Sequence, residues 1–377
     1  MSTKTSPSPT QAPCAQPQEQ STKTYSRRAM LTAGATSLAG LCLGAEDLFA
    51  ADDTLTHQKI PHLSGIGDVG GMVRGVGQRR QGYVLEVHHR SVYPNTIYPV
   101  KGAAAKQMVD TFIKTYTKKS TVADAWGQFV GPGDVVGILV DAIGKQQARV
   151  RPAVIKAIAL GLIAAGVNAN HIIVWTRHGK YLPQVGFKIN WTKNGVRAVG
   201  ADQMGFDARH GFRIKSGLFG QTCAISKIVS RYCTHIINVA SLQDHPVIGC
   251  RLSLAQQILA SYSCSGSFVR KWGGPDIGVI SKQTIIRQKF ILHMIDGLAG
   301  TYDGGLSGWN PQVIMGGTDP VALDRIGFSK IEAARRRTAA TLISNSRRNP
   351  QYIGLADTNG LGESDLLKIK HQKVFLR

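Results

Sequence analysis

The sequence has few acidic residues, few aromatic residues and no apolar run long enough to span a membrane. Its 377 residues include 23 Asp and Glu against 45 Lys and Arg, which gives a formal net charge of +22, and aromatic residues make up 7%. The N-terminal apolar stretch, residues 29–43, is 15 residues long, whereas a membrane span takes about 20. With 43% hydrophobic residues, collagen-like, coiled-coil and disordered classes are excluded for the bulk of the chain.

Several motifs of common enzymes are also absent. The chain contains no H-E-x-x-H, no G-x-S-x-G and no P-loop, which argues against zincin proteases, α/β-hydrolases and P-loop kinases. No C-x-x-C pair is present, so neither a ferredoxin-type iron–sulfur cluster nor a zinc ribbon is encoded. The sequence does not decide whether the protein is an enzyme.

The N-terminal region has the features of an export signal. Residues 1–25 are rich in Ser, Thr, Pro and Gln, which predicts disorder, and Arg27-Arg28 then precedes the short apolar stretch. Twin arginines in this position are typical of the bacterial twin-arginine signal. We expect the translocation machinery to recognise Arg27 and Arg28, cleavage within residues 48–51, and a periplasmic or otherwise extracytoplasmic mature protein without a stable membrane span.

The charge imbalance belongs to the mature chain. Residues 1–51 carry four basic and three acidic residues, so the remaining chain keeps 41 and 20, a net charge of +21. Anionic envelope polymers are therefore candidate partners. No helix-turn-helix pattern and no aromatic interleaving accompany the basic pairs, so nucleic acid is not expected. Of the cysteines that remain, Cys223, Cys233, Cys250 and Cys264, the number allows two disulfides, but folding in a reducing cytoplasm favours buried free thiols.

Hydrophobic periodicity predicts an α/β fold with a mainly parallel sheet and crossover helices. Residues 135–140 and 172–175 are apolar runs typical of strands buried on both faces, and a helix from Pro152 to Gly166 separates them. A helix is also expected at residues 103–117. Further strands are predicted at 236–239, 290–295 and 312–315, and further helices at 253–259 and from Asp319-Pro320 onward. We expect a signal peptide over residues 1–51, a Gly-rich linker over 52–79 and a single α/β domain over 80–377.

The strand ends select the candidate site residues, because ligands of parallel sheets bind at the carboxyl ends of the strands. His245 with Asp244 is the candidate catalytic pair, since an imidazole beside a carboxylate transfers protons or binds metal. The candidate ligand-binding residues that follow strands are Asp141, Gln243, Asp296 and Asp319. If they converge, His245, Asp296 and Asp319 are candidate ligands of a divalent metal. For each residue alone, a turn or a helix cap is the alternative.

An ordered series of motifs over about residues 80–375 resembles a known family. The motifs are residues 129–138, 165–167 with 172–175, 234–239 leading to Asp244-His245, 295–298, 302–305, 318–325 and 360–362. The chain thereby resembles the family called domain of unknown function 362, in particular its exported, twin-arginine branch. The resemblance implies no established activity. Some relatives carry ferredoxin-type cysteine clusters, which this chain lacks.

The chain departs from the family pattern at its expected pocket. Relatives usually have Lys and Asn where this chain has Leu139 and Asp141, and Lys where it has Gln243. A further family Lys falls in the segment Ala255-Gln256-Gln257. Asp244, His245, Asp296, Asp319 and Asp324 persist, so the resemblance adds Asp324 to the candidate ligand-binding residues. A lysine-rich pocket suits an anionic ligand, so the resemblance implies that the ligand of this site has changed or that the site has been lost.

Three functional hypotheses follow from the sequence. The first is an exported α/β enzyme or binder with a carboxylate and histidine pocket for an unknown small ligand, with a divalent metal as its candidate cofactor. The second is a non-catalytic protein that binds anionic envelope polymers through its basic surface. The third and weakest is a redox partner, since the chain shows no ligand set for an iron–sulfur cluster.

Overall fold

The computed structural model describes residues 63, 65–69, 79–93, 100–144, 149–192, 194–216, 219–304, 308–337 and 348–377. Residues 51–377 form one compact unit. The expected signal, with Arg27 and Arg28, lies outside the described residues. None of the described helices is both long enough and apolar enough to cross a bilayer.

A mixed sheet of ten strands organises this unit, in the order β12-β1-β11-β9-β7-β2-β3-β4, with β10 pairing to β9 and β8 to β7. The strands are β1 (Tyr83–His89), β2 (Val136–Val140), β3 (Ile172–Thr176), β4 (Arg197–Gly200), β7 (His235–His245), β8 (Gly249–Cys250), β9 (Phe290–Thr301), β10 (Gly308–Trp309), β11 (Val313–Gly317) and β12 (Lys370–Leu376). The neighbours from β9 to β4 are parallel. β11 runs antiparallel to both β9 and β1. The predicted α/β class is confirmed.

The central strands are apolar on both faces because helices cover both. In β2, Ile138 and Val140 contribute to one hydrophobic cluster while Leu139 contributes to the other, and in β3 Val174 and Trp175 divide in the same way. Successive side chains of a strand point to opposite faces, so an unbroken apolar run fits a strand covered on both sides. The two clusters form the core of the unit.

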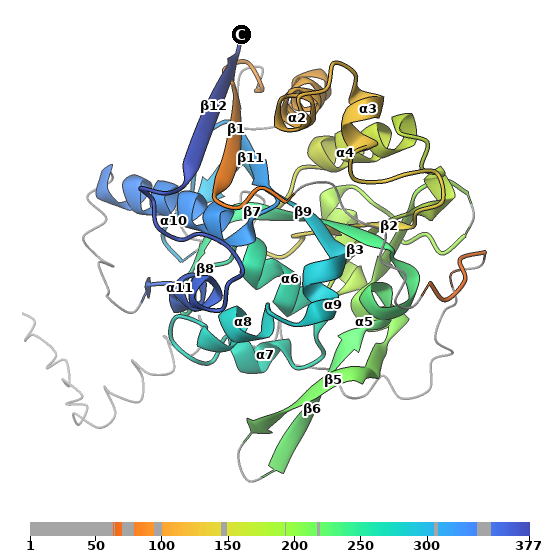
Figure 1. Cartoon of the computed structure of the whole chain (residues 1–377), viewed down its shortest axis with the longest axis vertical. Coiled ribbons are helices and arrows are strands. Elements are labelled where there is room, and N and C mark those ends of the chain that lie inside the picture. Colours follow the sequence, from red (N-terminus) through yellow and green to blue (C-terminus); the bar gives the residue numbers. More distant parts are fainter. Residues whose placement is uncertain are drawn as a thin grey trace, which may run out of the picture. The chain divides into compact units, whose positions relative to one another are not determined.

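Helices and a hairpin complete the unit (Figure 1). The helices are α2 (Gly102–Thr117), α3 (Val122–Trp126), α4 (Pro152–Ala164), α5 (Ala201–Met204), α6 (Ser253–Ser261), α7 (Ser265–Phe268), α8 (Pro275–Ile280), α9 (Thr284–Lys289), α10 (Pro320–Arg337) and α11 (Gln351–Thr358). The apolar faces of α2 and α4 belong to one cluster, and those of α6 and α10 to the other. β5 (Phe206–Ser216) and β6 (Phe219–Ser226) pair as a separate antiparallel hairpin.

Part of the expected Gly-rich linker packs into the core. Leu63 is 0% exposed and Ile66 3% exposed, and both join the cluster on the α6 face. The backbone N–H of Val69 donates to the carbonyl oxygen of Arg231 at 2.7 Å. Two apolar side chains in a polar, Gly-rich stretch are too few to produce a periodic signal, so the sequence does not reveal this docking.

The expectation of free thiols is wrong for Cys223 and Cys264, which form a disulfide. The fold brings the end of β6 and the start of α7 to a Cα–Cα distance of 5.2 Å, within the range that a disulfide bridges. Cys233 and Cys250 are buried free thiols. The bridge ties the β5–β6 hairpin to the segment that follows α6.

Candidate functional site

The sheet contains a topological switch point between β2 and β7. From β2 the chain continues through α4 to β3 on one side, and from β7 it continues through α6 to α9 and reaches β9 on the other side. The two connections also cover opposite faces of the sheet. Ligands of open α/β sheets bind where the strand order reverses, outside the carboxyl ends of the strands. The carboxyl ends of the strands at the switch point are therefore where the sequence predicts the site.

Asp141 and Gln243, two of the candidates selected from the sequence, are in contact at this switch point. The Asp141 carboxylate, 1% exposed, accepts hydrogen bonds from the Gln243 amide and the Arg251 guanidinium. The Ser241 hydroxyl donates to the same carboxylate at 3.1 Å. The charge of Asp141 is thus balanced inside the protein. This network closes the crevice between β2 and β7 with protein groups.

Asp296 lies on the neighbouring strand β9 and holds the start of α4. Its carboxylate accepts the backbone N–H of Arg151 at 2.7 Å and that of Leu298 at 3.0 Å. The Arg151 guanidinium lies 3.8 Å from the same carboxylate. Complete burial raises the pKa of Asp296, and the charge and backbone N–H of Arg151 oppose that rise. Asp296 joins the middle of β9 to the residue before α4.

Asp244 and His245 have different partners although they are adjacent. Asp244 accepts from the Arg335 guanidinium at 3.2 Å and from the Arg348 guanidinium at 3.3 Å. Thr301 and Gly304 donate to the same carboxylate. Asp244 thereby fastens the C-terminal half of the chain to the end of β7.

The His245 imidazole is neutral and partly buried. Its Nδ1 accepts the backbone N–H groups of Val247 and Ile248, both at 3.2 Å. Burial, and then the charges of Arg251 and Arg348, lower the pKa of His245 to about 3. With Nδ1 used as an acceptor, this histidine organises the turn after β7 and is not positioned by Asp244 as a general base.

Asp319 caps α10 and fastens two other segments. Its carboxylate accepts the backbone N–H groups of Val321 and Ala322, both at 2.9 Å, which is the usual pattern of a helix N-cap. It also accepts the N–H groups of Gly82 at 2.8 Å and Glu363 at 3.0 Å. Four backbone donors therefore occupy the oxygens that a metal or substrate would need.

Asp324, a residue of α10, caps the N-terminus of α6. It is 0% exposed and accepts the backbone N–H groups of Ser253 at 2.7 Å and Leu254 at 2.9 Å, in the first turn of α6. Burial raises the pKa of Asp324 well above its ordinary value, and the two N–H groups oppose this. Asp324 anchors α6 to α10.

The direction of β11 separates Asp319 from the other candidates. Gly317 at the end of β11 pairs with His293 near the start of β9, so Asp319 lies at the amino end of β9 and not at its carboxyl end. The structure thus does not bring all the predicted residues into one pocket. Among the residues that the structure describes, no group of three or more His, Cys, Asp or Glu side chains is arranged to hold a metal ion. A divalent metal at His245, Asp296 and Asp319 remains a prediction from the sequence.

A groove of ≈ 670 Å³ opens between the N-terminal turns of α2 and α4, which follow the carboxyl ends of β1 and β2. Its charged and polar lining residues are Lys106, Arg149, Arg151, Lys156 and Gln184, and its apolar lining residues include Val100, Ala153, Ala157 and Leu160. Among the described residues that line it, none is acidic. Leu160 is 52% exposed. The groove therefore combines positive charge with an accessible apolar wall.

The two helices present uncapped first turns to this groove. The residues before α2 and α4 are Lys101 and Arg151, neither side chain caps its helix, and neither first turn contains an acidic residue. Helix N-termini carry partial positive charge and free N–H groups, which acidic or hydroxyl side chains usually complement. Here basic residues stand in those positions, so neither first turn is complemented by its own segment. At α4 the Asp296 carboxylate from β9 accepts the backbone N–H of Arg151.

The sequence interpretation missed the groove residues and Arg251. The one signal for the groove was Pro152, which places the first turn of a helix directly after the polar connection that follows β2. Lys106 and Lys156 lie on solvent-facing positions of amphipathic helices, where a basic residue carries no information about which groove it lines. Their common location depends on how α2 packs against α4.

Comparison with known proteins gives little further information. No family model matches the sequence, and no curated protein matches it significantly. Among solved structures, a structural-genomics crystal structure of a protein from Thermotoga maritima aligns at 9% identity with a TM-score of 0.38. The alignment covers 63% of this chain and 60% of the Thermotoga chain. A similarity of this size carries no argument about function.

Proposed function

We propose that this protein binds a small anionic ligand with an apolar portion in the groove between α2 and α4. The observation that carries the proposal is the meeting of two helix N-termini, neither capped by the preceding side chain, with Lys106, Arg149 and Lys156, in a groove whose described lining residues include no acid. Helix N-termini attract phosphate and carboxylate groups. The proposal keeps the sequence-based idea of a ligand site at the carboxyl ends of the strands but moves it from the carboxylates to basic residues.

The three basic residues of the groove differ in how far their charge is already paired. Lys106 pairs with Asp110 one turn further along α2, at 2.5 Å, on the partly exposed helix surface. The Arg149 Nε donates to the carbonyl oxygen of Gly144 at 2.6 Å, which fixes its guanidinium beside the groove. Lys156 is exposed, with no ion pair to any described residue. The apolar wall with Leu160 favours a ligand whose anionic group is attached to a hydrocarbon body.

The test is isothermal titration calorimetry of the purified protein with octyl phosphate, and with octyl glucoside as the neutral probe of equal chain length. We expect octyl phosphate to bind and Lys156→Gln to weaken it by about five- to tenfold, since one charged contact is worth roughly 1 kcal/mol at a partly exposed site. Lys119→Gln, just beyond the other end of α2, is the matched control. Equal affinity for octyl glucoside, or an unchanged affinity in Lys156→Gln, would refute the proposal.

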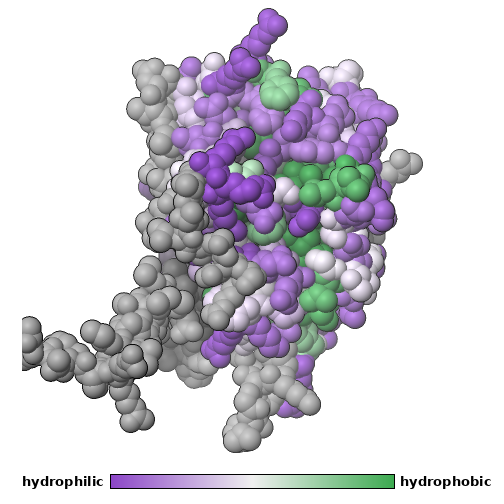
Figure 2. Space-filling view, turned by 90° about the vertical axis from the view of Figure 1, so that its left-hand side faces the viewer, coloured by the Kyte–Doolittle hydropathy of each residue, from purple (hydrophilic) through white to green (hydrophobic). Residues whose placement is uncertain are grey.

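Binding of anionic envelope polymers is the second candidate function. Lys368, Lys370 and Lys373 are exposed on and next to the edge strand β12. Figure 2 shows that hydrophilic residues cover much of the coloured surface on the side of the molecule where β12 and α10 lie in Figure 1. Retention on heparin that falls steeply with salt, and that drops when these three lysines become Gln, would support it. Retention that is independent of salt would exclude it.

We further propose that the protein is exported by the twin-arginine route and is a distant relative of the domain of unknown function 362 family. Arg27-Arg28 before residues 29–43 supports the route, and the ordered motifs over residues 80–375 support the kinship. All the residues used in the groove lie in the compact unit that begins at residue 51. Removal of a signal ending near that position would therefore leave the site intact.

A further inference from the structure

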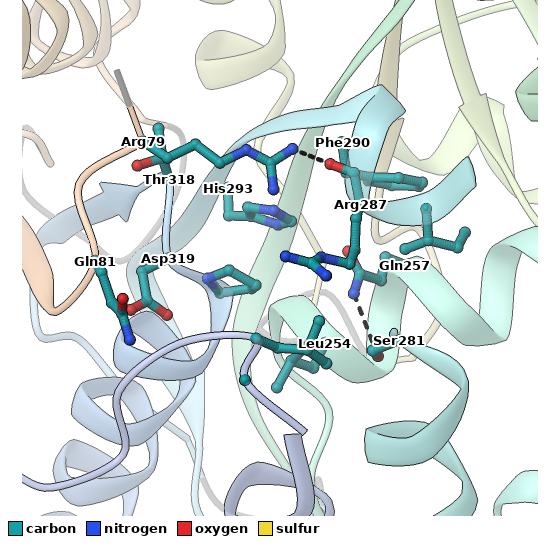
Figure 3. A pocket seen from close by; sticks show the side chains of 14 residues that line it. Arg79, Gln81, Leu254, Gln257, Ser281, Arg287, Phe290, His293, Thr318 and Asp319 are labelled. Atoms are coloured by element: carbon teal, nitrogen blue, oxygen red, sulfur yellow. Dashed lines mark hydrogen bonds between the residues drawn. The ribbon is translucent and has the colours of Figure 1, made fainter. Parts of the chain in front are cut away.

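A second, smaller cavity lies at the other end of the strands from the groove. It encloses ≈ 180 Å³ at the amino end of β9, beside the first turns of α6 and α10. Its polar lining includes Arg79, Gln257, Ser281, Arg287, His293 and Thr318. Figure 3 shows these side chains converging from the segment before β1, from α6, from α9 and from β9. None of them was among the site residues predicted from the sequence.

His293 presents its Nε2 to this cavity. The residue is 2% exposed, and its Nδ1 lies 2.8 Å from the Ser253 hydroxyl. The Asn238 amide nitrogen, which can only donate, lies 3.0 Å from that hydroxyl oxygen and 3.4 Å from Nδ1 itself, so donors surround Nδ1. By this network Nδ1 accepts and the imidazole proton resides on Nε2. No described residue accepts a hydrogen bond from Nε2. A buried donor is thus left for a group inside the cavity.

The surroundings of His293 favour the neutral imidazole. Burial, and then the charge of Arg79, lower the pKa of His293 to about 3. The Phe290 ring stacks against the imidazole with a centroid distance of 6.3 Å. The groups that face His293 from the surrounding elements are the two arginines, the Gln257 amide and the capped Asp319 carboxylate. The cavity therefore offers a fixed N–H donor rather than a proton acceptor.

Arg79 and Arg287 bring two positive charges to the mouth of the cavity. The Arg79 guanidinium donates to the backbone carbonyl oxygen of Arg287, and Figure 3 shows the His293 ring between the two arginine side chains. Burial, and then the charge of Arg287, lower the pKa of Arg79. Within the described parts of the chain, neither arginine is ion-paired with a carboxylate. Two like charges held together in this way favour an anion between them.

Among the described lining residues, the one carboxylate, that of Asp319, does not neutralise the two arginines. Asp319 accepts four backbone N–H groups, from Gly82, Val321, Ala322 and Glu363. Its oxygens are thereby committed to the backbone. Gln257, 2% exposed, donates to the Ser281 hydroxyl at 3.4 Å, which holds its amide at the cavity wall. The described polar groups that remain to bind a ligand in the cavity are the two guanidinium ions of Arg79 and Arg287 and the neutral donors of His293 and Gln257.

We propose that the cavity is a binding site for a small oxyanion, of the size of phosphate, sulfate or a short carboxylate. His293 Nε2 and the Gln257 amide would donate to the anion inside the cavity, and Arg79 and Arg287 would pair with it at the mouth. The enclosed volume of ≈ 180 Å³ accommodates several water molecules at about 30 Å³ each, which is too small for a nucleotide. This site is separate from the groove between α2 and α4 and does not depend on the function proposed for it.

The test is calorimetric titration of the purified protein with sodium phosphate, sodium sulfate and sodium succinate at constant ionic strength set with sodium chloride. We expect at least one of the three to bind, and its identity defines the anion class. Arg287→Gln should weaken that binding by about ten- to hundredfold, because a charged hydrogen bond contributes roughly 1.5–3 kcal/mol. Arg287 is exposed on α9, so this change should leave the fold intact.

Two further variants make the result decisive. Arg79→Gln should weaken binding as Arg287→Gln does, whereas Lys156→Gln in the groove should leave it unchanged. In the wild type, the bound anion should also shift the NMR signal of the His293 Nε2 proton. The proposal is overturned if none of the three anions binds, if binding persists in both arginine variants, or if Lys156→Gln weakens it as much as Arg287→Gln.

Discussion

The Asp141 carboxylate and the Arg251 guanidinium form a buried ion pair between residues that are 110 positions apart in the sequence. Asp141 ends β2 and Arg251 precedes α6, so the pair bridges the two chain segments that diverge at the switch point of the sheet. Arg251 also donates to the carbonyl oxygen of Ile143 at 3.3 Å. A ligand that entered between β2 and β7 would have to displace this pair.

The pair should therefore be important for stability. We expect Arg251→Met to lower the free energy of unfolding by about 3–5 kcal/mol, because it leaves the Asp141 charge buried without its partner. The double variant with Asp141→Asn should lose less than the sum of the two single variants. Urea unfolding monitored by circular dichroism measures both quantities. Additive losses would show that the two side chains do not interact.

His293 should titrate far below its ordinary pH range. With its pKa lowered to about 3, the folded protein keeps the imidazole neutral while the unfolded chain protonates it below about pH 6.5. Its contribution to stability is thus complete above pH 6.5 and is lost as the pH falls toward 3, by roughly 1.4 kcal/mol per unit. Nitrogen-15 NMR should show the Nε2–H tautomer, with no change between pH 8 and pH 5. Titration near pH 6.5 would contradict the assignment.

Glu86 should stabilise the edge of the sheet in a pH-dependent way. Burial alone would raise its pKa, but hydrogen bonds from His371 and His88 and the charge of Lys330 outweigh it and hold the pKa well below the ordinary value. The stabilisation is therefore present above about pH 4.5 and is lost as the pH falls below it. Glu86→Gln should be less stable than the wild type at pH 7, and the difference should shrink below pH 4.5. A difference that stays constant down to pH 2.5 would argue against this role.

The disulfide between Cys223 and Cys264 should be a measurable part of the stability. The bridge closes a loop with a sequence separation of 41, for which the chain-entropy relation gives roughly 4 kcal/mol. We expect the double variant Cys223→Ser, Cys264→Ser to lose an amount of this order in urea unfolding. Thiol titration of the denatured chain from residue 52 onward should detect only Cys233 and Cys250 before reduction. Four reactive thiols would show that the bridge does not form.

Export should depend on the paired arginines. Changing Arg27 and Arg28 together to Lys should leave the precursor in the cytoplasm, because the receptor of the twin-arginine pathway recognises the pair. Cell fractionation and immunoblotting measure the distribution, and a precursor with Lys23→Gln serves as the control. Normal export of the double-lysine precursor would remove the basis for an extracytoplasmic location.

The sequence predicted secondary structure best where apolar residues recur with the spacing of a single strand or helix. The runs at 135–140 and 172–175 predicted two strands covered on both faces, and the structure has β2 and β3 there. The helical spacing at 103–117 and the proline at position 152 located α2 and α4. The same reasoning missed β1 and β12, since neither was predicted as a strand. β12 is mostly polar and exposed, so it lacks the apolar run on which the prediction relied.

The sequence predicted the site only in part, because many side chains there bind partners from distant segments of the chain. The strand-end rule selected both Asp141 and Gln243, and in the structure these two side chains are in contact. It also selected Asp319, whose carboxylate instead caps α10. Whether a carboxylate binds a ligand or a helix terminus depends on which backbone N–H groups the fold brings within reach, and those of Gly82 and Glu363 come from distant segments.

The sequence by itself determined the alternation of buried strands and amphipathic helices, and hence the α/β class, because residue spacing reports burial within each segment. Only the tertiary structure decided the direction of β11, the pairing of Cys223 with Cys264 and the convergence of Arg79, Arg287 and His293 on one cavity. These features join segments that are far apart in the chain. Their relative positions are set by how whole elements pack, and no local periodicity encodes that packing.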